Sequence, residues 1–176
     1  FYPRNSRNSI RAELGITDDC HLLLYVGRLA REKNIVNLLE MMQHLRHARP
    51  ACHLCLMGDG ELKRLVRRRI EHTGDVTLLP YASSTERLAE IYSAADLFVH
   101  AGTSETFGLV SVEAQCCGTR VLAVRNGGLD ETIDKAEWFG MAPDASPREL
   151  AEAVMAIMRH PDSPASKATR RQRVIV

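Results

Sequence analysis

The length, composition and charge of the chain limit what it can be. With 176 residues, of which 45% are hydrophobic, it can bury one sizeable core and is too short for two ordinary domains. We therefore expect a single domain over residues 1–176. Twenty-three Lys and Arg residues nearly balance 22 Asp and Glu residues, which excludes an overall field that attracts nucleic acid or an anionic membrane.

Apolar runs alternate with segments of helical period in the first half of the chain. His21–Val26 is a predicted strand, and the apolar residues between positions 34 and 46 predict an amphipathic helix. Cys52–Met57 is the next predicted strand, followed by a glycine-containing turn and a strongly basic helix. Val76–Leu79 is the third. The apolar face of the first helix would consist of Ile35, Leu38, Leu39, Met42 and Leu45.

The second half continues the alternation. A capping-box pattern at 83–86 predicts the start of a helix, and Leu97–His100 and 121–124 are two further predicted strands, separated by a helix that begins near Phe107. The pattern at 146–149 combines an N-cap serine, a proline at the first helical position and a capping glutamate. This alternation favours an α/β fold, a doubly wound, Rossmann-like parallel sheet with helices on both faces.

The five cysteines, an odd number mostly in apolar stretches, favour reduced thiols in a cytoplasmic compartment over a disulfide framework. Cys52 and Cys55 form a CxxC pattern in a predicted strand, where residues three apart point to opposite faces, so we interpret them as core thiols. The seven His residues are scattered and no second Cys/His pair has the spacing of metal ligands, so no metal is expected. No cofactor is expected either. No stretch approaches the roughly 20 apolar residues that span a bilayer, and a soluble protein is expected.

Ligands of open α/β sheets bind at the carboxyl ends of the strands, so the loops there are candidate binding segments. After the first strand, Gly27 and Arg28 precede Arg31 and Lys33, and a guanidinium with an ammonium suits a pyrophosphate. From the residues alone, ordinary surface charges before a helix remain the favoured alternative.

The second strand is followed by Gly58 and Gly60, which either let a ligand approach the backbone or simply form a tight turn; the turn is the favoured interpretation. The run KRLVRRR at 63–69 then invites a nucleic-acid hypothesis. Because no aromatic residues are interleaved with these charges, a solvated helix face is favoured and no nucleic-acid partner is expected.

The loop after the fourth strand, AGTSETFGLVSVEA at 101–114, is the most informative segment. Small residues and Glu105 lead to Gly108, where the first-turn N–H groups of a helix would form an anion cradle that a phosphate could approach without meeting a Cβ. Glu113 lies farther into the helix and could accept hydrogen bonds from a ribose diol. Two carboxylates on either side of a phosphate-binding turn fit a nucleotide sugar. The alternative is one glutamate placed by the helix dipole and one surface glutamate.

Together these stretches resemble the C-terminal domain of GT-B glycosyltransferases of family four, the "glycosyl transferases group 1" family. Glu105 and Glu113, with seven residues between them, match the signature of that family. The matching segments cover roughly residues 10–160 and are YVGRLAREKN (25–34), LMGDGEL (56–62), SAADLFVHAGTSETFGLVSVEAQCCGTRVLAV (93–124) and NGGLDE (126–131).

The resemblance implies catalytic roles for Arg28 and Lys33 on the donor diphosphate and for Glu105 on the transferred sugar, and it places Glu113 on the ribose. Such enzymes retain the anomeric configuration, need no metal and use no enzyme nucleophile. The leaving phosphate is thought to help deprotonate the acceptor on the same face. The further donor contacts implied are Gly27, Gly58, Gly60, Thr106, Phe107, Gly108 and Leu109.

The chain departs from the family pattern in three places. Ala101-Gly102 stands where the family often has Pro-Ser, Pro80 replaces a glycine near the nucleobase, and Arg120 replaces a proline. His100, at the carboxyl end of a strand, could line the donor site, although a structural histidine is the favoured interpretation.

The resemblance also implies a partner domain. The family places its acceptor site in an N-terminal Rossmann-like domain that this chain lacks, and any peripheral membrane contact would come through that domain. We expect the chain to bind a nucleotide-diphosphate sugar, with a UDP-sugar favoured over a GDP- or ADP-sugar, and not to transfer sugar alone. The alternatives are a sugar-nucleotide epimerase or phosphorylase relative of the same architecture and a non-catalytic nucleotide-sugar-binding module. The absence of GxGxxG after the first strand disfavours a dehydrogenase.

Overall fold

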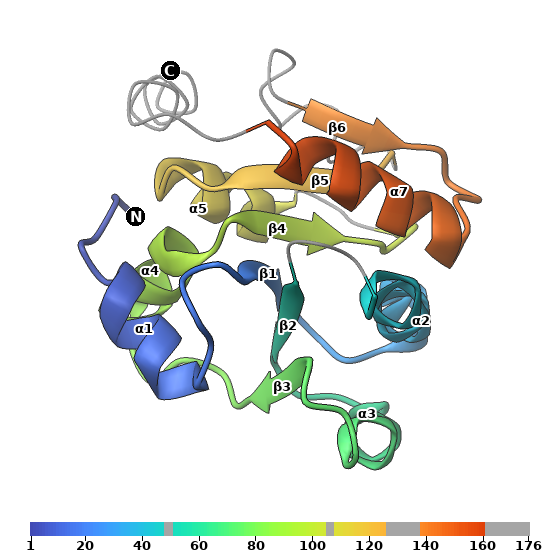
Figure 1. Ribbon diagram of the computed structural model, residues 1–176, viewed down its shortest axis with the longest axis horizontal. Coiled ribbons are helices and arrows are strands. Elements are labelled where there is room, and N and C mark those ends of the chain that lie inside the picture. Colours follow the sequence, from blue (N-terminus) through green and yellow to red (C-terminus); the bar gives the residue numbers. More distant parts are fainter. Residues whose placement is uncertain (48–50, 105–107, 126–137, 161–176) are drawn as a thin grey trace.

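The computed structural model describes residues 1–47, 51–104, 108–125 and 138–160. Its strands form one parallel sheet of six in the order β3-β2-β1-β4-β5-β6 (Figure 1). The predicted doubly wound, Rossmann-like α/β fold is therefore confirmed. The strands are β1 (His21–Val26), β2 (Cys52–Met57), β3 (Val76–Leu79), β4 (Leu97–His100), β5 (Arg120–Val124) and β6 (Trp138–Met141).

Helices cover both faces of the sheet (Figure 1). Buried residues of α2, α3 and α7 form one core cluster with the sheet, and those of α1, α4 and α5 form a second on its other face. In the part of the chain that the structure describes, no helix combines the length and apolar character needed to cross a membrane. The helices are α1 (Arg7–Leu14), the short 3₁₀ helix η1 (Arg31–Lys33), α2 (Ile35–Leu45), α3 (Lys63–Ile70), α4 (Thr85–Ala94), α5 (Leu109–Cys116) and α7 (Pro147–Met158).

The central strands are mostly apolar because both of their faces are buried. In β1, Leu23 and Tyr25 belong to one core cluster, and Leu22 and Leu24 belong to the other. The CxxC pattern of β2 behaves in the same way, with Cys52 in one cluster and Cys55 in the other. All five cysteines are free thiols. The interpretation of Cys52 and Cys55 as separate core residues is confirmed.

Helix α1 was not predicted, and it is held by a buried cation as well as by the apolar packing of Ile10. The side chain of Arg11 is 2% exposed, and its Nη1 lies 3.4 Å from Oδ2 of Asp96, just before β4. The same carboxylate oxygen accepts a hydrogen bond of 2.8 Å from the backbone N–H of Leu22. These contacts tie α1 to the amino ends of β1 and β4.

Two helix starts test the predicted caps. At α7, Ser146 and Glu149 form the predicted capping box, with Pro147 in the first turn. At α4, the N-cap is Ser84, whose Oγ accepts from the backbone N–H of Arg87. The helix therefore has a serine cap one residue after Ser83, and Glu86 is not at the third helical position that a capping box requires.

Arg120, which replaces the family proline, is 8% exposed at the start of β5. Its Nη1 donates to the carbonyl oxygens of Ile157 and His160, at 3.1 and 2.8 Å. The guanidinium therefore binds one carbonyl in the last turn of α7 and one just beyond the end of the helix.

Candidate functional site

Strands β1 and β4 are neighbours in the sheet although β2 and β3 come between them in the chain. Their register pairs Leu23 with Leu97 and Leu24 with Phe98. The chain leaves β1 toward β2 and leaves β4 toward β5, which are on opposite sides, so the strand order reverses between β1 and β4. In folds of this kind, ligands bind in the crevice at the carboxyl ends of the two strands. We call this the β1/β4 crevice.

Side chains of the loop after β1 hold the loop after β4. The Nδ2 atom of Asn34 donates to the carbonyl of Ala101 at 3.0 Å, and Nζ of Lys33 donates to the carbonyl of Ser104 at 2.8 Å. Asn34 has φ 50°, the sole positive φ at a non-glycine position within the described ranges, and asparagine tolerates this conformation best. The ammonium group of Lys33 is thereby held at the β1/β4 crevice.

Gly102 allows the two loops to approach closely. A Cβ at this position would lie 2.8 Å from Cε1 of His100 and 3.2 Å from Cα of Lys33. The adjacent backbone N–H of Thr103 donates to the carbonyl of Glu32 at 3.2 Å. Glycine in place of the bulkier residue of the family pattern is therefore explained by loop packing.

Arg28 extends into solvent beside the crevice. Its side chain is 69% exposed, and Nη2 lies 3.9 Å from Oε1 of Glu32, a pair that contributes little in water. The Oη atom of Tyr25 donates to the backbone carbonyl of Arg28 at 2.9 Å, which fixes the backbone beneath this mobile side chain. His100 is 1% exposed and its ring lies 6.3 Å from that of Tyr25, as expected of a structural histidine.

The glycines of the β1 and β2 loops have a packing role. A Cβ on Gly58 would lie 1.9 Å from the carbonyl oxygen of Gly27, and a Cβ on Gly60 would lie 2.6 Å from that of Leu29. The N–H of Gly27 donates to Met57, and that of Gly58 donates to Leu79, both within the backbone. These contacts support the tight-turn interpretation, and donor contacts by Gly27, Gly58 and Gly60 stay predictions.

Helix α5 begins at Leu109, two residues after the position near Phe107 at which it was expected. Gly108 precedes it with φ 60° and ψ 32°, a left-handed conformation that favours glycine. The carbonyl of Gly108 accepts from the N–H groups of Ser111 and Val112, at 2.8 and 3.3 Å. The amino end of α5, which is the positive end of the helix dipole, therefore follows directly after the β4 loop. The side chain of Leu109 is exposed at this end.

Glu113 is half-buried on α5, and its Oε2 accepts a hydrogen bond of 3.0 Å from Oη of Tyr92 on α4. Burial raises the pKa of the Glu113 carboxyl, while the hydrogen bond from Tyr92 lowers it. Sequence reasoning missed Tyr92, which the helical period marks only as a core residue. A signal was available, because a buried tyrosine needs a partner for its hydroxyl.

Three predicted site residues, Glu105, Thr106 and Phe107, lie outside the described residues, and so does the NGGLDE segment at 126–131. Their roles stay predictions. Across the described ranges, no three His, Cys, Asp or Glu side chains gather in a way that could hold a metal ion.

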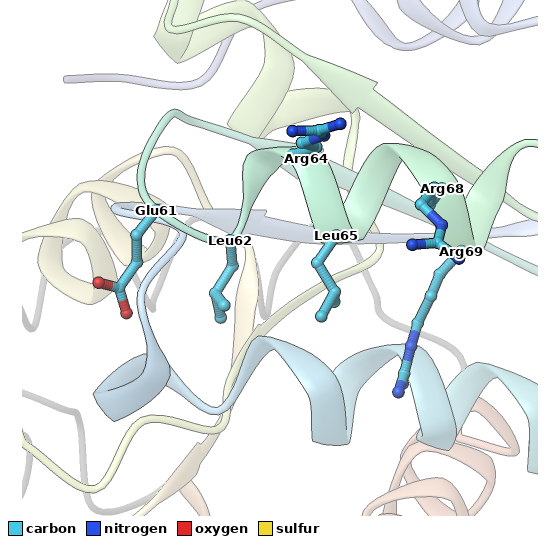
Figure 2. Close-up of a pocket in the computed structure, with 6 residues that line it drawn as sticks. All are labelled: Glu61, Leu62, Arg64, Leu65, Arg68 and Arg69. Carbon is cyan, nitrogen blue, oxygen red and sulfur yellow. The ribbon is translucent and has the colours of Figure 1, made fainter.

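A separate hollow of about 600 Å³ lies along α3, which we call the α3 hollow. In Figure 2, Leu62, Leu65 and Arg69 point toward α2, and Nη1 of Arg69 lies 3.6 Å from Oε1 of Glu40. The lining contains no aromatic side chain, which agrees with the interpretation of α3 as a solvated basic face. The hollow is lined by Glu61, Leu62, Arg64, Leu65, Arg68 and Arg69.

Comparison with known proteins identifies the family to which the chain belongs. The family model "Glycosyl transferases group 1" matches residues 6–173. The chain belongs to this family. The resemblance inferred from the sequence motifs is confirmed, and the group 1 chain shares its fold with solved glycosyltransferases.

Sucrose-phosphate synthase from Thermosynechococcus elongatus is similar with a TM-score of 0.78 and 31% identity, over 99% of this chain and 45% of that one. The lipopolysaccharide 1,2-N-acetylglucosaminetransferase of Salmonella typhimurium is 31% identical over 142 residues, which cover 75% of this chain and 37% of that protein. A GDP-mannose-dependent alpha-(1-6)-phosphatidylinositol dimannoside mannosyltransferase of Mycobacterium tuberculosis is 28% identical over 177 residues, covering 98% of this chain and 44% of its own length. The group 1 chain thus spans less than half the length of each.

Proposed function

We propose that the chain is the donor-binding half of a retaining, metal-independent glycosyltransferase, which transfers a sugar from a nucleoside diphosphate sugar to an acceptor. The observation that supports this most directly is the hydrogen bond from Lys33 to Ser104, because it holds a cation at the β1/β4 crevice, where the loop that leads to α5 begins. One relative is named as GDP-mannose-dependent, which supports a nucleoside diphosphate sugar as the donor class. The proposed donor is a UDP-, GDP- or ADP-sugar, and the preference for UDP stays a prediction.

The donor diphosphate would lie between the β1 loop and the start of α5. Arg28 would supply a planar pair of donors, and Lys33 a single ammonium group. The N–H groups at the start of α5 would bind the same anion, and Gly108 would let it approach without a Cβ in the way. Backbone contacts from Leu109 complete this part of the proposed site.

The two ends of the donor would be bound by the two glutamates. Glu113 would accept hydrogen bonds from the ribose hydroxyls, and Glu105 would accept them from the transferred sugar. Thr106 and Phe107 would line the sugar between these carboxylates. With the ribose at Glu113 and the sugar at Glu105, the diphosphate between them would lie at the turn that separates the two glutamates.

In the proposed reaction, the bond between the anomeric carbon and the donor phosphate oxygen breaks while the acceptor oxygen bonds to the same face of that carbon. The acceptor proton passes to the departing phosphate. Arg28 and Lys33 would stabilise the negative charge that develops on the phosphate, which is how charged groups fixed in advance lower a barrier. The acceptor would be bound by a second domain, since the relatives are more than twice as long as the matched segment.

The test is a calorimetric titration of the 176-residue chain with UDP, GDP and ADP and then with their sugars, combined with transfer assays. We expect weak binding of one nucleoside diphosphate and no transfer by the chain alone. If none of the three binds at millimolar concentration while circular dichroism reports an intact fold, the donor site is wrong. Transfer by the chain alone would overturn the need for a second domain.

Assays of the full-length protein separate the remaining functions. A glycosyltransferase gives a glycosylated acceptor with the anomeric configuration of the donor. An epimerase would instead change the donor sugar without an acceptor, and a binding module would give neither product.

A further inference from the structure

Tyr92 is a completely buried residue of α4 whose hydroxyl has a specific partner. Its exposed fraction is 0%, and Oη donates to Oε2 of Glu113 at 3.0 Å. A buried phenol without a partner would be destabilising, so this hydrogen bond contributes to the choice of tyrosine over phenylalanine. The bond connects two helices on the same face of the sheet.

The surroundings of Tyr92 leave its hydroxyl little freedom. The ring lies 5.9 Å from that of Phe98 on β4 and 6.0 Å, edge to face, from that of Phe1. The backbone carbonyl of Tyr92 accepts from Oγ1 of Thr119 at 2.6 Å. A donor held by packing on both sides and by its backbone can fix a flexible acceptor.

Glu113 is such an acceptor, because its side chain rotates about three bonds, the last with a broad preference. The bond from Tyr92 uses Oε2 and leaves Oε1 and further lone pairs to accept other hydrogen bonds. A vicinal diol needs two acceptor positions in a fixed orientation. A half-buried carboxylate held at one oxygen meets that need better than a freely rotating one.

We propose that Tyr92 is a positioning residue, which orients the Glu113 carboxylate so that its remaining lone pairs accept the ribose hydroxyls of the donor. The inference rests on the proposed role of Glu113 in ribose binding. It assigns to the contact between α4 and α5 a function beyond packing, since phenylalanine would fill the same volume without the hydroxyl.

The same hydrogen bond has an electrostatic consequence. Burial raises the pKa of Glu113, and donation from Tyr92 counters this by favouring the ionised carboxylate, which is the better acceptor. Among the described residues, the other titratable side chain beside the pair is Cys117, directly after α5. Without the hydroxyl, Glu113 would become protonated at a higher pH.

The experiment uses Tyr92→Phe in the full-length protein. Binding is measured for whichever of UDP, GDP and ADP binds best and for its 2′-deoxy counterpart, between pH 5 and 8. We expect Kd for the ribonucleotide to rise by about tenfold, with a smaller change for the deoxynucleotide, so that discrimination between the two narrows. The loss of affinity on acidification should begin at a higher pH than in the wild type.

Tyr25→Phe is the matched control, because it removes another buried tyrosine hydroxyl, the one that donates to the backbone carbonyl of Arg28. It should leave the ratio of ribonucleotide to deoxynucleotide affinity unchanged. Glu113→Gln should abolish the discrimination, and adding Tyr92→Phe to it should change nothing more.

The two possible failures are distinguishable. If Glu113→Gln keeps the wild-type discrimination, the proposed function of Glu113 is wrong. If Glu113→Gln abolishes it while Tyr92→Phe keeps both the wild-type discrimination and the wild-type pH profile, Glu113 binds ribose and the positioning role of Tyr92 is wrong.

Discussion

The β1/β4 crevice and the α3 hollow differ in the structural features that define them. The hollow has the larger share of cations, with Arg64, Arg68 and Arg69 in its lining, and it forms a cavity of about 600 Å³. The crevice is defined instead by the reversal of strand order and by the hydrogen bonds that join its loops, such as Asn34 to Ala101. The cations and the volume of the α3 hollow would favour it as an anion-binding site, whereas the strand topology favours the β1/β4 crevice.

The difference lies in how Lys33, one of the two cations proposed to bind at the crevice, is held. Arg64 and Arg68 are exposed and have no ion pair among the described residues, so their orientation is set by solvent. Lys33 is half-buried, and its Nζ is fixed by Ser104. A ligand that binds at the crevice therefore meets a group that has already lost part of its conformational freedom, which lowers the entropy cost of binding. Lys33 thus differs from Arg64 and Arg68 in its fixed position and not in its charge.

The largest effect should come from the backbone that forms the crevice. Gly58→Ala would place a Cβ 1.9 Å from the carbonyl oxygen of Gly27, so the β1 and β2 loops would have to separate. We expect the free energy of unfolding to fall by about 3 kcal/mol or more, measured by urea denaturation. Gly74→Ala, between α3 and β3, is the control, because no atom lies within 4 Å of its new Cβ. Equal stability of the two variants would contradict the tight packing of these loops.

A smaller effect, on binding alone, should separate the two cationic regions. Arg28→Ala and Lys33→Ala each remove a hydrogen bond to a charged phosphate, worth about 1.5–3 kcal/mol, so Kd for the nucleoside diphosphate should rise by about 10- to 100-fold. Arg64→Ala and Arg68→Ala should change Kd by less than about twofold, since exposed charges are screened by salt. Calorimetry of all four variants at one salt concentration measures both effects.

The reverse ranking, in which the α3 variants weaken binding most, would place the anion site in the α3 hollow.

The smallest effect concerns stability and should spare the crevice. Burial lowers the pKa of His53 from 6.5, and its ring bonds Thr77 on β3 at 2.9 Å. Because the unfolded state then binds more protons below pH 6.5, the free energy of unfolding should fall as the pH decreases through this range. His53→Gln should flatten this dependence and leave nucleotide affinity at pH 7.5 unchanged. An unchanged slope in His53→Gln would assign the pH dependence to other groups, such as His21, whose pKa is also lowered by burial.

Much of the fold could be predicted from the sequence because local pattern and tertiary burial agree. The first four strands have the predicted bounds, since their apolar runs end at a glycine, at Pro80 or at His100, and the predicted apolar face of α2 is buried. Helix α1 could not be found in this way, because the buried contact between Arg11 and Asp96 joins segments far apart in the chain. The edge strand β6 is short and contains a glycine, so it has little pattern to detect.

The site was predictable to the extent that a single loop encodes it. The start of α5 could be placed to within two residues, near Phe107 instead of at Leu109, because the residues on both sides of Gly108 supply the signal. The contact between Tyr92 and Glu113 joins two helices, and neither residue alone predicts the other. The role of Gly102 likewise depends on His100 and Lys33 as neighbours in space.

Arg120 limits how this domain can be recombined with its relatives. Its buried guanidinium binds the carbonyls of Ile157 and His160, so β5 and the end of α7 form a matched pair. A chimera that takes β5 from this chain and α7 from a relative with a different helix end would leave a buried charge without its partners, a change that is strongly destabilising. Crossover points for domain grafting are therefore better placed before residue 120 or after residue 160 than between them.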